Sequence, residues 1–213
     1  MDMVKLLHVT DIHGSRRALK EIIKLHPLVD FMVISGDVAN YFDLHFFYEF
    51  FEEICKVNKR VFYVLGNNEP KDLEAPHPCV KLDGRREEAY GLTFGGLGGS
   101  PYTPYNTPNE YLEVEAENIL NRLGKVDILV SHAPPYGTRA DKGYKGHFGS
   151  KAVLSYVLKY KPKLVLSGHV HEAHYAGWLN GTLLINPGMT REGHYAIVDV
   201  SEDVSYELVN FNE

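Results

Sequence analysis

Short apolar runs that are typical of buried β-strands alternate with helical patterns over the first third of the chain. The strand-like runs cover residues 4–10, 29–35 and 60–65, and the segments between them, 16–26 and 44–57, place apolar residues at helical spacing. Strands separated by helices of this length form βαβ units, in which right-handed crossovers join parallel strands. The alternation therefore predicts an α/β fold before any single residue is considered.

The second third mixes loop with further strands and helices. Residues 84–111 are rich in Gly, Pro and Tyr, so we expect mostly loop there, with one or two strands. A helix near 110–122 follows, and strands at 126–131 and 162–167 flank a helix at about 150–160. Ser150 is a suitable N-cap for that last helix, because its side-chain oxygen can accept from a backbone N–H in the first turn.

From Ala173 onward the sequence contains only short strand-like runs joined by turns such as Asn180-Gly181. We predict a single domain over residues 1–213, built as two mixed β-sheets packed as a sandwich and flanked by helices. In the simplest arrangement, the parallel half of the chain forms one sheet and the antiparallel half forms the other.

Composition narrows the environment and the partners. The net charge of -6 argues against general attraction to nucleic acid or to anionic membranes. No apolar run reaches the roughly 18–20 residues that span a bilayer. Cys55 and Cys79 lack metal-type spacing, so we expect two buried thiols in a reducing compartment. The chain enters its first strand without a basic leader, which favours a mature, cytoplasmic protein.

Metal-competent side chains follow five of the predicted strands at the point where each strand ends. They are Asp11 and His13, then Asp37, then Asn67, then His132, and finally His169 and His171. Ligands in α/β proteins gather outside the carboxyl ends of the strands, so we expect these scattered residues to converge. Glycines beside four of the five groups allow the sharp turns and close approaches that such a site needs.

The residue types at these strand ends fit divalent transition metals. Aspartate and neutral histidine are good ligands for Mn, Fe, Co, Ni or Zn, whereas Mg and Ca prefer all-oxygen sites. A pair of metals about 3.5–4 Å apart also needs a bridging carboxylate and can activate water as a nucleophile. Each histidine alone is better explained as a turn or core residue, but the set at five strand ends favours metal binding.

With these motifs the chain resembles the calcineurin-like metallophosphoesterases, whose signature is Asp-x-His, Gly-Asp, Gly-Asn-His-Asp/Glu, a lone His after a strand, and Gly-His-x-His. All five blocks occur in order over essentially the whole length. The segments "GGSPYTPYNTP", "SHAPPYGTRAD", "GHVHEAHYAG" and "LLINPG" are similar to the small single-domain branch that includes brain protein 239 and related microbial phosphodiesterases.

The resemblance implies a function and a set of ligands. Two divalent transition-metal ions, with manganese favoured, would be bound by the following residues: Asp11, His13 and His171 on the first ion, Asp37 as the bridge, and Asn67, His132 and His169 on the second ion. The implied activity is hydrolysis of a small aryl or nucleotide phosphodiester, by in-line attack of a metal-activated hydroxide on phosphorus.

Asn68 departs from the family pattern, which has His at this position. That histidine is thought to lie near the departing oxygen and to supply a proton, a role worth about 10²–10⁴-fold in rate. Asn68 can donate a hydrogen bond but no proton at physiological pH. We therefore count Asn68 and Asp37 as catalytic candidates, and expect Asn68 to favour substrates whose leaving group needs little protonation. His147 and His174 flank the site region, and either could replace the missing acid.

Other residues near the motifs have two readings each. Arg139 could bind a substrate phosphate or pair with Asp141, and Tyr102 and Tyr105 could stack on a base or pack over the sheet. The histidines outside the strand ends, which are His8, His26, His45 and His77, favour structural roles. The aromatic run 46–51 predicts core packing and leaves open a subunit interface in a homo-oligomer.

Two alternative functions remain besides a small-molecule phosphodiesterase. A nuclease is disfavoured by the acidic net charge, and a partner protein that binds without catalysis is disfavoured because every ligand position is filled. A small phosphoester is therefore the expected partner, with neither membrane nor nucleic acid involved.

Overall fold

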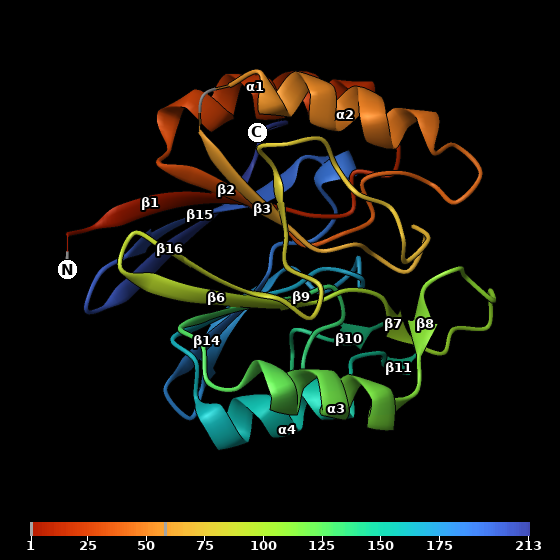
Figure 1. Ribbon diagram of the computed structural model, residues 1–213, viewed down its shortest axis with the longest axis vertical. Coiled ribbons are helices and arrows are strands. Elements are labelled where there is room, and N and C mark those ends of the chain that lie inside the picture. Colours follow the sequence, from red (N-terminus) through yellow and green to blue (C-terminus); the bar gives the residue numbers. More distant parts are fainter. Residues whose placement is uncertain (1, 58) are drawn as a thin grey trace.

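A computed structural model describes residues 2–57 and 59–213 as two β-sheets packed face to face, with a pair of helices on each outer side (Figure 1). The first sheet has the strand order β16-β15-β1-β2-β3-β4 and the second has the order β13-β14-β12-β9-β6-β5. The predicted sandwich of two mixed sheets flanked by helices is confirmed.

The first sheet consists of β1 (Val4–Val9), β2 (Phe31–Ile34), β3 (Arg60–Tyr63), β4 (Val80–Lys81), β15 (His194–Val200) and β16 (Val204–Asn210). Its outer face carries α1 (Arg16–Leu25) and α2 (His45–Cys55), together with the short 3-10 helices η1 (His26–Leu28) and η2 (Thr190–Glu192) at its ends. Four phenylalanines of α2 are fully buried against this face, which confirms the core role of the aromatic run 46–51.

The second sheet consists of β5 (Arg86–Ala89), β6 (Leu92–Leu97), β9 (Ile128–Ser131), β12 (Leu164–Leu166), β13 (Tyr175–Leu179) and β14 (Thr182–Asn186). Its outer face is covered by α3 (Glu113–Leu123) and α4 (Lys151–Tyr160) (Figure 1). Ser150 caps α4 as predicted, since its side chain accepts from the backbone N–H of Val153. The strands β2 and β9 are buried along their whole length, because each sheet has a second layer on both faces.

The expectation that the parallel half of the chain forms one sheet and the antiparallel half the other is wrong. β15 pairs antiparallel with β1 in the first sheet, whereas β14 pairs parallel with β12 in the second, so both sheets take strands from both halves. The segment 84–111 also contains more strand than expected, because β6 crosses it as an interior strand. Gly95 and Gly96 hide β6 in the sequence; a Cβ on Gly95 would lie 2.5 Å from Leu123, so helix packing explains the glycine.

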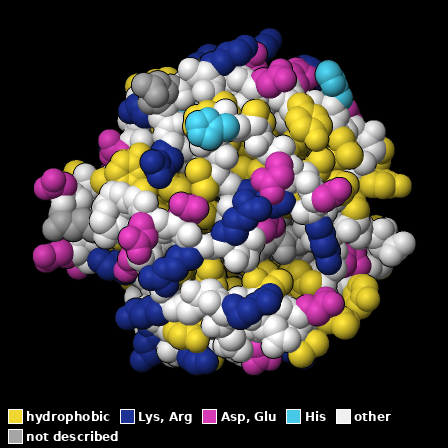
Figure 2. Space-filling model, in the orientation of Figure 1, with side chains coloured by type: hydrophobic (Ala, Val, Ile, Leu, Met, Phe, Trp, Pro, Cys, Tyr) yellow, Lys and Arg dark blue, Asp and Glu magenta, His cyan; other side chains and the backbone are white. Residues whose placement is uncertain are grey.

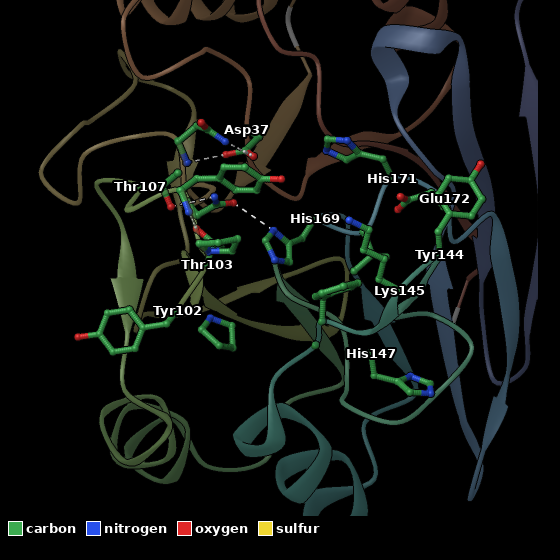
Figure 3. A pocket seen from close by; sticks show the side chains of 18 residues that line it. Asp37, Tyr102, Thr103, Thr107, Tyr144, Lys145, His147, His169, His171 and Glu172 are labelled. Atoms are coloured by element: carbon green, nitrogen blue, oxygen red, sulfur yellow. Dashed lines mark hydrogen bonds between the residues drawn. The ribbon is translucent and has the colours of Figure 1, made fainter.

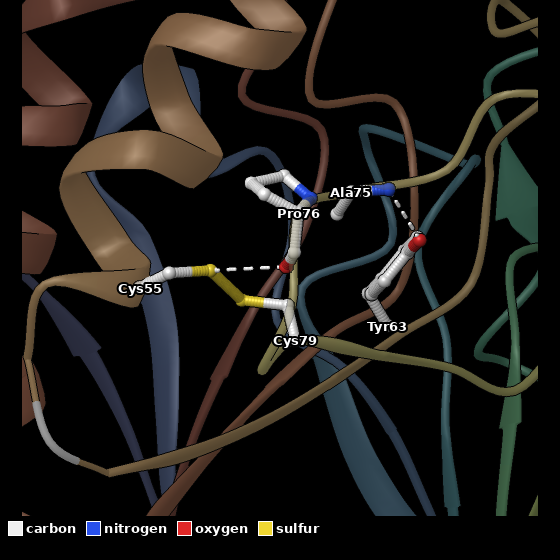
Figure 4. Close-up of a disulfide and its surroundings, with 5 residues drawn as sticks. All are labelled: Cys55, Tyr63, Ala75, Pro76 and Cys79. Carbon is white, nitrogen blue, oxygen red and sulfur yellow. Dashed lines mark hydrogen bonds between the residues drawn. A yellow bond between two sulfur atoms is a disulfide. The ribbon is translucent and has the colours of Figure 1, made fainter.

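Cys55 and Cys79 form a disulfide, so the expectation of two buried thiols is wrong (Figure 4). The bond joins the last residue of α2 to the loop that precedes β4. Beside it, the hydroxyl of Tyr63 accepts a hydrogen bond from the backbone N–H of Ala75 at 2.7 Å. In the chain-entropy view, a bridge over 24 residues contributes about 3 kcal/mol of stability. The cysteine count therefore no longer argues for a reducing compartment.

The carboxyl ends of five strands open on one edge of the sandwich. β1, β2 and β3 run parallel in the first sheet, and β9 and β12 run parallel in the second. Two short strand pairs lie beyond this edge, β7 (Ser100–Pro101) with β8 (Glu110–Tyr111), and β10 (Lys142–Gly143) with β11 (Gly146–His147) (Figure 1). Among the described residues, no helix has the length and apolar character that crossing a membrane requires.

Candidate metal centre

Ligand atoms from both sheets meet at this edge in two overlapping groups. Asp11, His13 and His171 form the first, and Asp11, Asp37 and His132 form the second; in each group the ligand atoms lie within 4.8 Å of one another. Asp11 and Asp37 come from the ends of β1 and β2 in the first sheet, and His132 follows β9 in the second. The sequence prediction that these residues converge agrees with this placement.

The distances in the first group call for a cation. The Nε2 atoms of His13 and His171 lie 3.3 Å apart, and they are 3.3 and 3.0 Å from the same oxygen, Oδ1 of Asp11. The Nδ1 atom of His13 already faces Oδ1 of Asn40 at 3.1 Å, so it carries the proton and its Nε2 presents a lone pair. Burial lowers the pKa of His13, but Asp11 and Asp37 outweigh it and raise the pKa to about 9. Lone pairs that face each other at these distances are stabilised by a shared positive charge, which either a proton or a divalent metal can supply.

The second group has the same construction around Asp37. The Nε2 atom of His132 lies 3.4 Å from Oδ2 of Asp37, while its Nδ1 faces the carbonyl oxygen of Ser35 at 2.7 Å. That contact places the proton of a neutral His132 on Nδ1 and leaves Nε2 free to bind. His13 Nε2 lies 3.7 Å from the same carboxylate oxygen, so Asp37 of the second group also lies close to a histidine of the first, while Asp11 belongs to both groups.

Asn67 presents its side-chain oxygen to two histidines. Its Oδ1 lies 2.9 Å from Nε2 of His132 and 3.1 Å from Nδ1 of His169. The opposite end of the amide is fixed, because Nδ2 donates to Oγ1 of Thr107 at 3.0 Å and that hydroxyl donates to Glu110 at 2.6 Å. The chain Asn67–Thr107–Glu110 therefore keeps the amide oxygen directed at the histidines.

Replacing Thr107 with Val should weaken manganese binding by about 10–100-fold, because loss of an outer hydrogen bond to a ligand has effects of that size. The variant keeps the shape of the side chain but removes the acceptor for Asn67 Nδ2, so the amide can turn its oxygen away. Titration calorimetry with Mn²⁺ measures the change. Thr107→Ser should restore binding, and Thr138→Val, which removes a contact to the carbonyl of Pro135 instead, is the matched control. Equal affinity in Thr107→Val and wild type would contradict this role.

Asn68 forms hydrogen bonds to the Asp37 carboxylate through both its main chain and its side chain. Its backbone N–H donates to Oδ1 of Asp37 and its Nδ2 donates to Oδ2, each at 2.9 Å. The next residue, Glu69, is fully buried and accepts from the backbone N–H groups of Gly66, Asp37 and Ala39 at 2.8, 3.2 and 3.0 Å. Glu69 thereby ties the end of β3 to the end of β2, which sets Asn67 and Asp37 at a fixed separation.

The electrostatics of the site favour ionised carboxylates beside positive charge. Burial alone would raise the pKa of Asp37, but His132 and His13 outweigh it and lower the pKa to about 2. Burial lowers the pKa of His132, yet Asp37 overcomes this and the pKa rises to about 9. The pKa of His169 falls to about 4 through burial and the nearby His132. The ionised carboxylates of Asp11 and Asp37 therefore attract cations, and His169 presents a neutral ring that can act as a ligand.

The backbone at the site adopts conformations that residues other than glycine rarely take. Asp11, His13, Asp37 and His169 have φ angles of 52°, 45°, 54° and 66°. Such left-handed positions are unfavourable for residues with a Cβ and collect at functional sites, where the surrounding structure enforces them. Gly168 shows how close the packing is, since a Cβ there would lie 2.0 Å from Thr10 Oγ1 and 2.2 Å from Asp11 Oδ2.

A pocket of about 640 Å³ lies over the metal centre (Figure 3). Its floor includes Asp37, Asn67, Asn68, His169 and His171. One side is lined by Pro101, Tyr102, Thr103, Pro104, Tyr105 and Thr107. The other is lined by Tyr144 and Lys145, which join β10 to β11, and by His147, Phe148 and Gly149. Aromatic rings stand free in both walls, for Tyr102, Tyr105 and Tyr144 are 74%, 82% and 90% exposed. The arrangement offers a metal centre at the bottom and aromatic surfaces above it.

Several residues singled out in the sequence lie outside this centre. The guanidinium of Arg139 lies over the ring of Tyr175, 5.1 Å from its centroid. Among the described residues it forms no ion pair with Asp141, and it does not line the pocket. His174 stacks on His194, with ring centroids 3.9 Å apart. His8 is buried and contacts Ser35 Oγ at 2.8 Å, and His26 is buried at the end of α1. His147 does line the pocket, with its Nδ1 2.6 Å from Asp141.

Sequence reasoning missed the residues that orient the ligands. These are Asn40 beside His13, Thr107 and Glu110 behind Asn67, and the glutamate that joins the two strand ends, Glu69. Only Glu69 had a signal, because the family motif has an acidic residue at that position. Thr107 and Glu110 lie about forty residues after Asn67 in an irregular segment, so no periodicity or spacing could connect them.

Comparison with known proteins agrees with the geometry. The family model described as calcineurin-like phosphoesterase matches residues 4–173. An uncharacterized protein of Methanocaldococcus jannaschii is 29% identical over 197 residues, which are 86% of this chain and 88% of the relative. A protein named probable cyclic nucleotide phosphodiesterase, from Xenorhabdus bovienii, is 21% identical over 239 residues, covering 98% of this chain and 96% of the relative.

Among solved structures, a protein of Thermus thermophilus has the same fold. It is 21% identical, with a TM-score of 0.77, and the match covers 98% of this chain and 99% of that one.

Proposed function

The chain belongs to the calcineurin-like phosphoesterase family, and we propose that it is a metal-dependent phosphodiesterase acting on small aryl or nucleotide phosphodiesters. The observation that carries the proposal is the convergence of two aspartates, four histidines and one asparagine oxygen at the strand ends. These donors suit divalent transition metals, with manganese favoured.

The residues divide naturally between two ions. Asp11, His13 and His171 would hold one, Asn67, His132 and His169 the other, and Asp37 both. When bound, such ions act as Lewis acids on the phosphoryl group and lower the pKa of water. The protein holds its ligands in place through Ser35, Asn40, Thr107 and Glu69, so little reorganisation is needed during the reaction.

The pocket supports a diester over a monoester. A monoester carries two negative charges near neutral pH, whereas a diester carries one. Among the lining residues that the structure describes, Lys145 is the single lysine, and none is an arginine. Space on both sides of the metal centre suits a phosphorus with two organic groups, and the exposed tyrosines suit an aryl group or a base. The relative from Xenorhabdus bovienii is named as a probable cyclic nucleotide phosphodiesterase, an enzyme class that also cleaves phosphodiesters.

A nuclease and a non-catalytic binding protein are the alternatives. On the face seen in Figure 2, basic and acidic side chains are interspersed and form no continuous basic band of the kind that follows a nucleic-acid backbone. A KM for small diesters that does not change with salt would disfavour a nuclease further.

The assay compares bis-p-nitrophenyl phosphate with p-nitrophenyl phosphate, after dialysis against EDTA and after addition of Mn²⁺. We expect hydrolysis that depends on added metal and a higher kcat/KM for the diester. A higher kcat/KM for the monoester would overturn the diester assignment. A rate that changes neither on addition of metal nor on replacement of Asp37 by Ala would favour the non-catalytic binding protein.

A further inference from the structure

The side chain of Asn68 supports a neighbouring carboxylate at the floor of the pocket. Asn68 donates its side-chain amide to Asp37 Oδ2 and its backbone N–H to Oδ1, so it acts as a support for the carboxylate. An amide cannot release a proton at neutral pH. A nucleotide diester nevertheless leaves behind an alkoxide, which is a poor leaving group until it is protonated. A proton for the departing oxygen therefore has to come from another group of the pocket or from solvent.

Lys145 is the cation that the pocket offers. It lies at the tip of the β10–β11 hairpin, between Gly143 and Gly146, and it lines the same cavity as Asp37, Asn68 and His169. In Figure 3 its side chain extends from the hairpin towards the part of the pocket that contains His169 and His171. His147, the other basic residue of this wall, has its ring at the far end of the pocket in the same view.

The hairpin that carries Lys145 is anchored at its base. Asp141 is fully buried, and its Oδ2 accepts from the backbone N–H groups of Gly137 and Gly149 at 3.1 and 2.9 Å. Its Oδ1 contacts His147 Nδ1 at 2.6 Å. Asp141 thus joins three points of the loop, so the hairpin can present a lysine on a defined base. His147 is held by this carboxylate as part of that base.

We propose that Lys145 is the general acid for the leaving group and supplies the proton that the Asn68 amide cannot. The proposal rests on the phosphodiesterase function above and assigns the residue that would allow cleavage of diesters of unactivated alcohols, such as nucleotide diesters. As water adds its oxygen to phosphorus and releases one proton to solvent, the bond from phosphorus to the leaving oxygen breaks and its electron pair stays on that oxygen. The Lys145 ammonium transfers one proton to it, which yields the alcohol and a neutral amine. The amine then regains a proton from solvent.

The test uses substrates whose leaving groups differ in their need for a proton. Bis-p-nitrophenyl phosphate releases a stable anion, diphenyl phosphate a less stable one, and a dinucleoside monophosphate an alkoxide. Lys145→Met should lower kcat for the dinucleoside by about 10²-fold or more, and for the nitrophenyl diester by less than about 10-fold, because only the former needs the acid. Lys145→Arg keeps the charge but is a poor proton donor, so it should retain KM and lose kcat on the dinucleoside.

Lys142→Met is the matched control, since Lys142 is exposed on the same hairpin but does not line the pocket. It should behave as wild type with all three substrates, and all variants should melt at the wild-type temperature because both lysines are exposed. The proposal is overturned if Lys145→Met lowers all three rates equally, or if Lys145→Arg matches wild type on the dinucleoside. Failure of the proposed function looks different, since wild type would then show no metal-dependent hydrolysis of any diester.

Discussion

Asp37→Asn should lower kcat/KM for a phosphodiester by at least about 10³-fold. Asp37 is buried on the floor of the pocket, and its carboxylate lies beside His13, His132 and Asn68. An amide there has the same shape but lacks the negative charge and one acceptor oxygen, so it cannot bridge two cations. Loss of several kcal/mol of transition-state stabilisation corresponds to a decrease of this size.

The experiment measures activity with saturating Mn²⁺ and the metal content of the purified variant. We expect fewer bound ions per chain than in wild type, together with a far-UV spectrum that does not change. Asp127→Asn is the matched control: Asp127 bonds to Thr93 between β6 and β9, away from the pocket, and the change should leave activity intact. Activity of Asp37→Asn within about 10-fold of wild type would show that Asp37 bridges nothing.

Gly66→Ala should both destabilise the protein, by about 1–3 kcal/mol, and reduce activity by about 10²-fold. Gly66 is the residue before Asn67, and a Cβ on it would lie 1.9 Å from Asp37 Oδ1 and 2.4 Å from the backbone nitrogen of Asp37. Asp37 cannot easily retreat, because Glu69 accepts from its backbone N–H and Asn68 holds its carboxylate. The methyl group therefore displaces a ligand, and a displacement of about 1 Å is enough for the activity loss.

Urea denaturation and steady-state kinetics test both parts of this prediction. Gly124→Ala provides the comparison, because Gly124 has a φ of 68° and a Cβ there would meet no atom within 4 Å. We expect it to lose about 1–3 kcal/mol of stability through its backbone conformation alone, since φ 68° with ψ -163° is a region that glycine occupies almost exclusively, and to keep full activity. If Gly66→Ala were as active as Gly124→Ala, the close approach of Gly66 to Asp37 would not be needed for activity.

The ligands could be predicted from the sequence because each one directly follows an apolar strand. The buried runs before Asp37 and His132 are short, β-branched and unbroken, and parallel strands deliver their ends to one edge. The same reasoning failed for β6, whose two glycines read as loop until Leu123 is seen against them. It also failed for Cys55 and Cys79, since nothing in a separation of 24 residues shows that a helix end and a loop meet.

The sequence singled out Tyr102, Tyr105 and His147 in the pocket walls, but it did not predict how these walls are held in place. Lys145 and Tyr102 lie in segments without periodicity, and their positions depend on anchors such as Asp141, whose partners are backbone groups. Backbone donors leave no trace in residue types. For the same reason Thr107, which controls the orientation of Asn67, has no sequence signature.

The ligand set draws from both layers of the sandwich. Asp11, Asp37 and Asn67 belong to the first sheet, and His132, His169 and His171 follow strands of the second. Ions bound between them would link the two layers, in addition to the apolar packing between the sheets and polar contacts such as that of His132 with Ser35. Metal binding would then add to the free energy of unfolding, by about 1.4 kcal/mol per site for every tenfold rise in free metal above Kd. The stability of the protein would in that case depend partly on the trace-metal content of its surroundings.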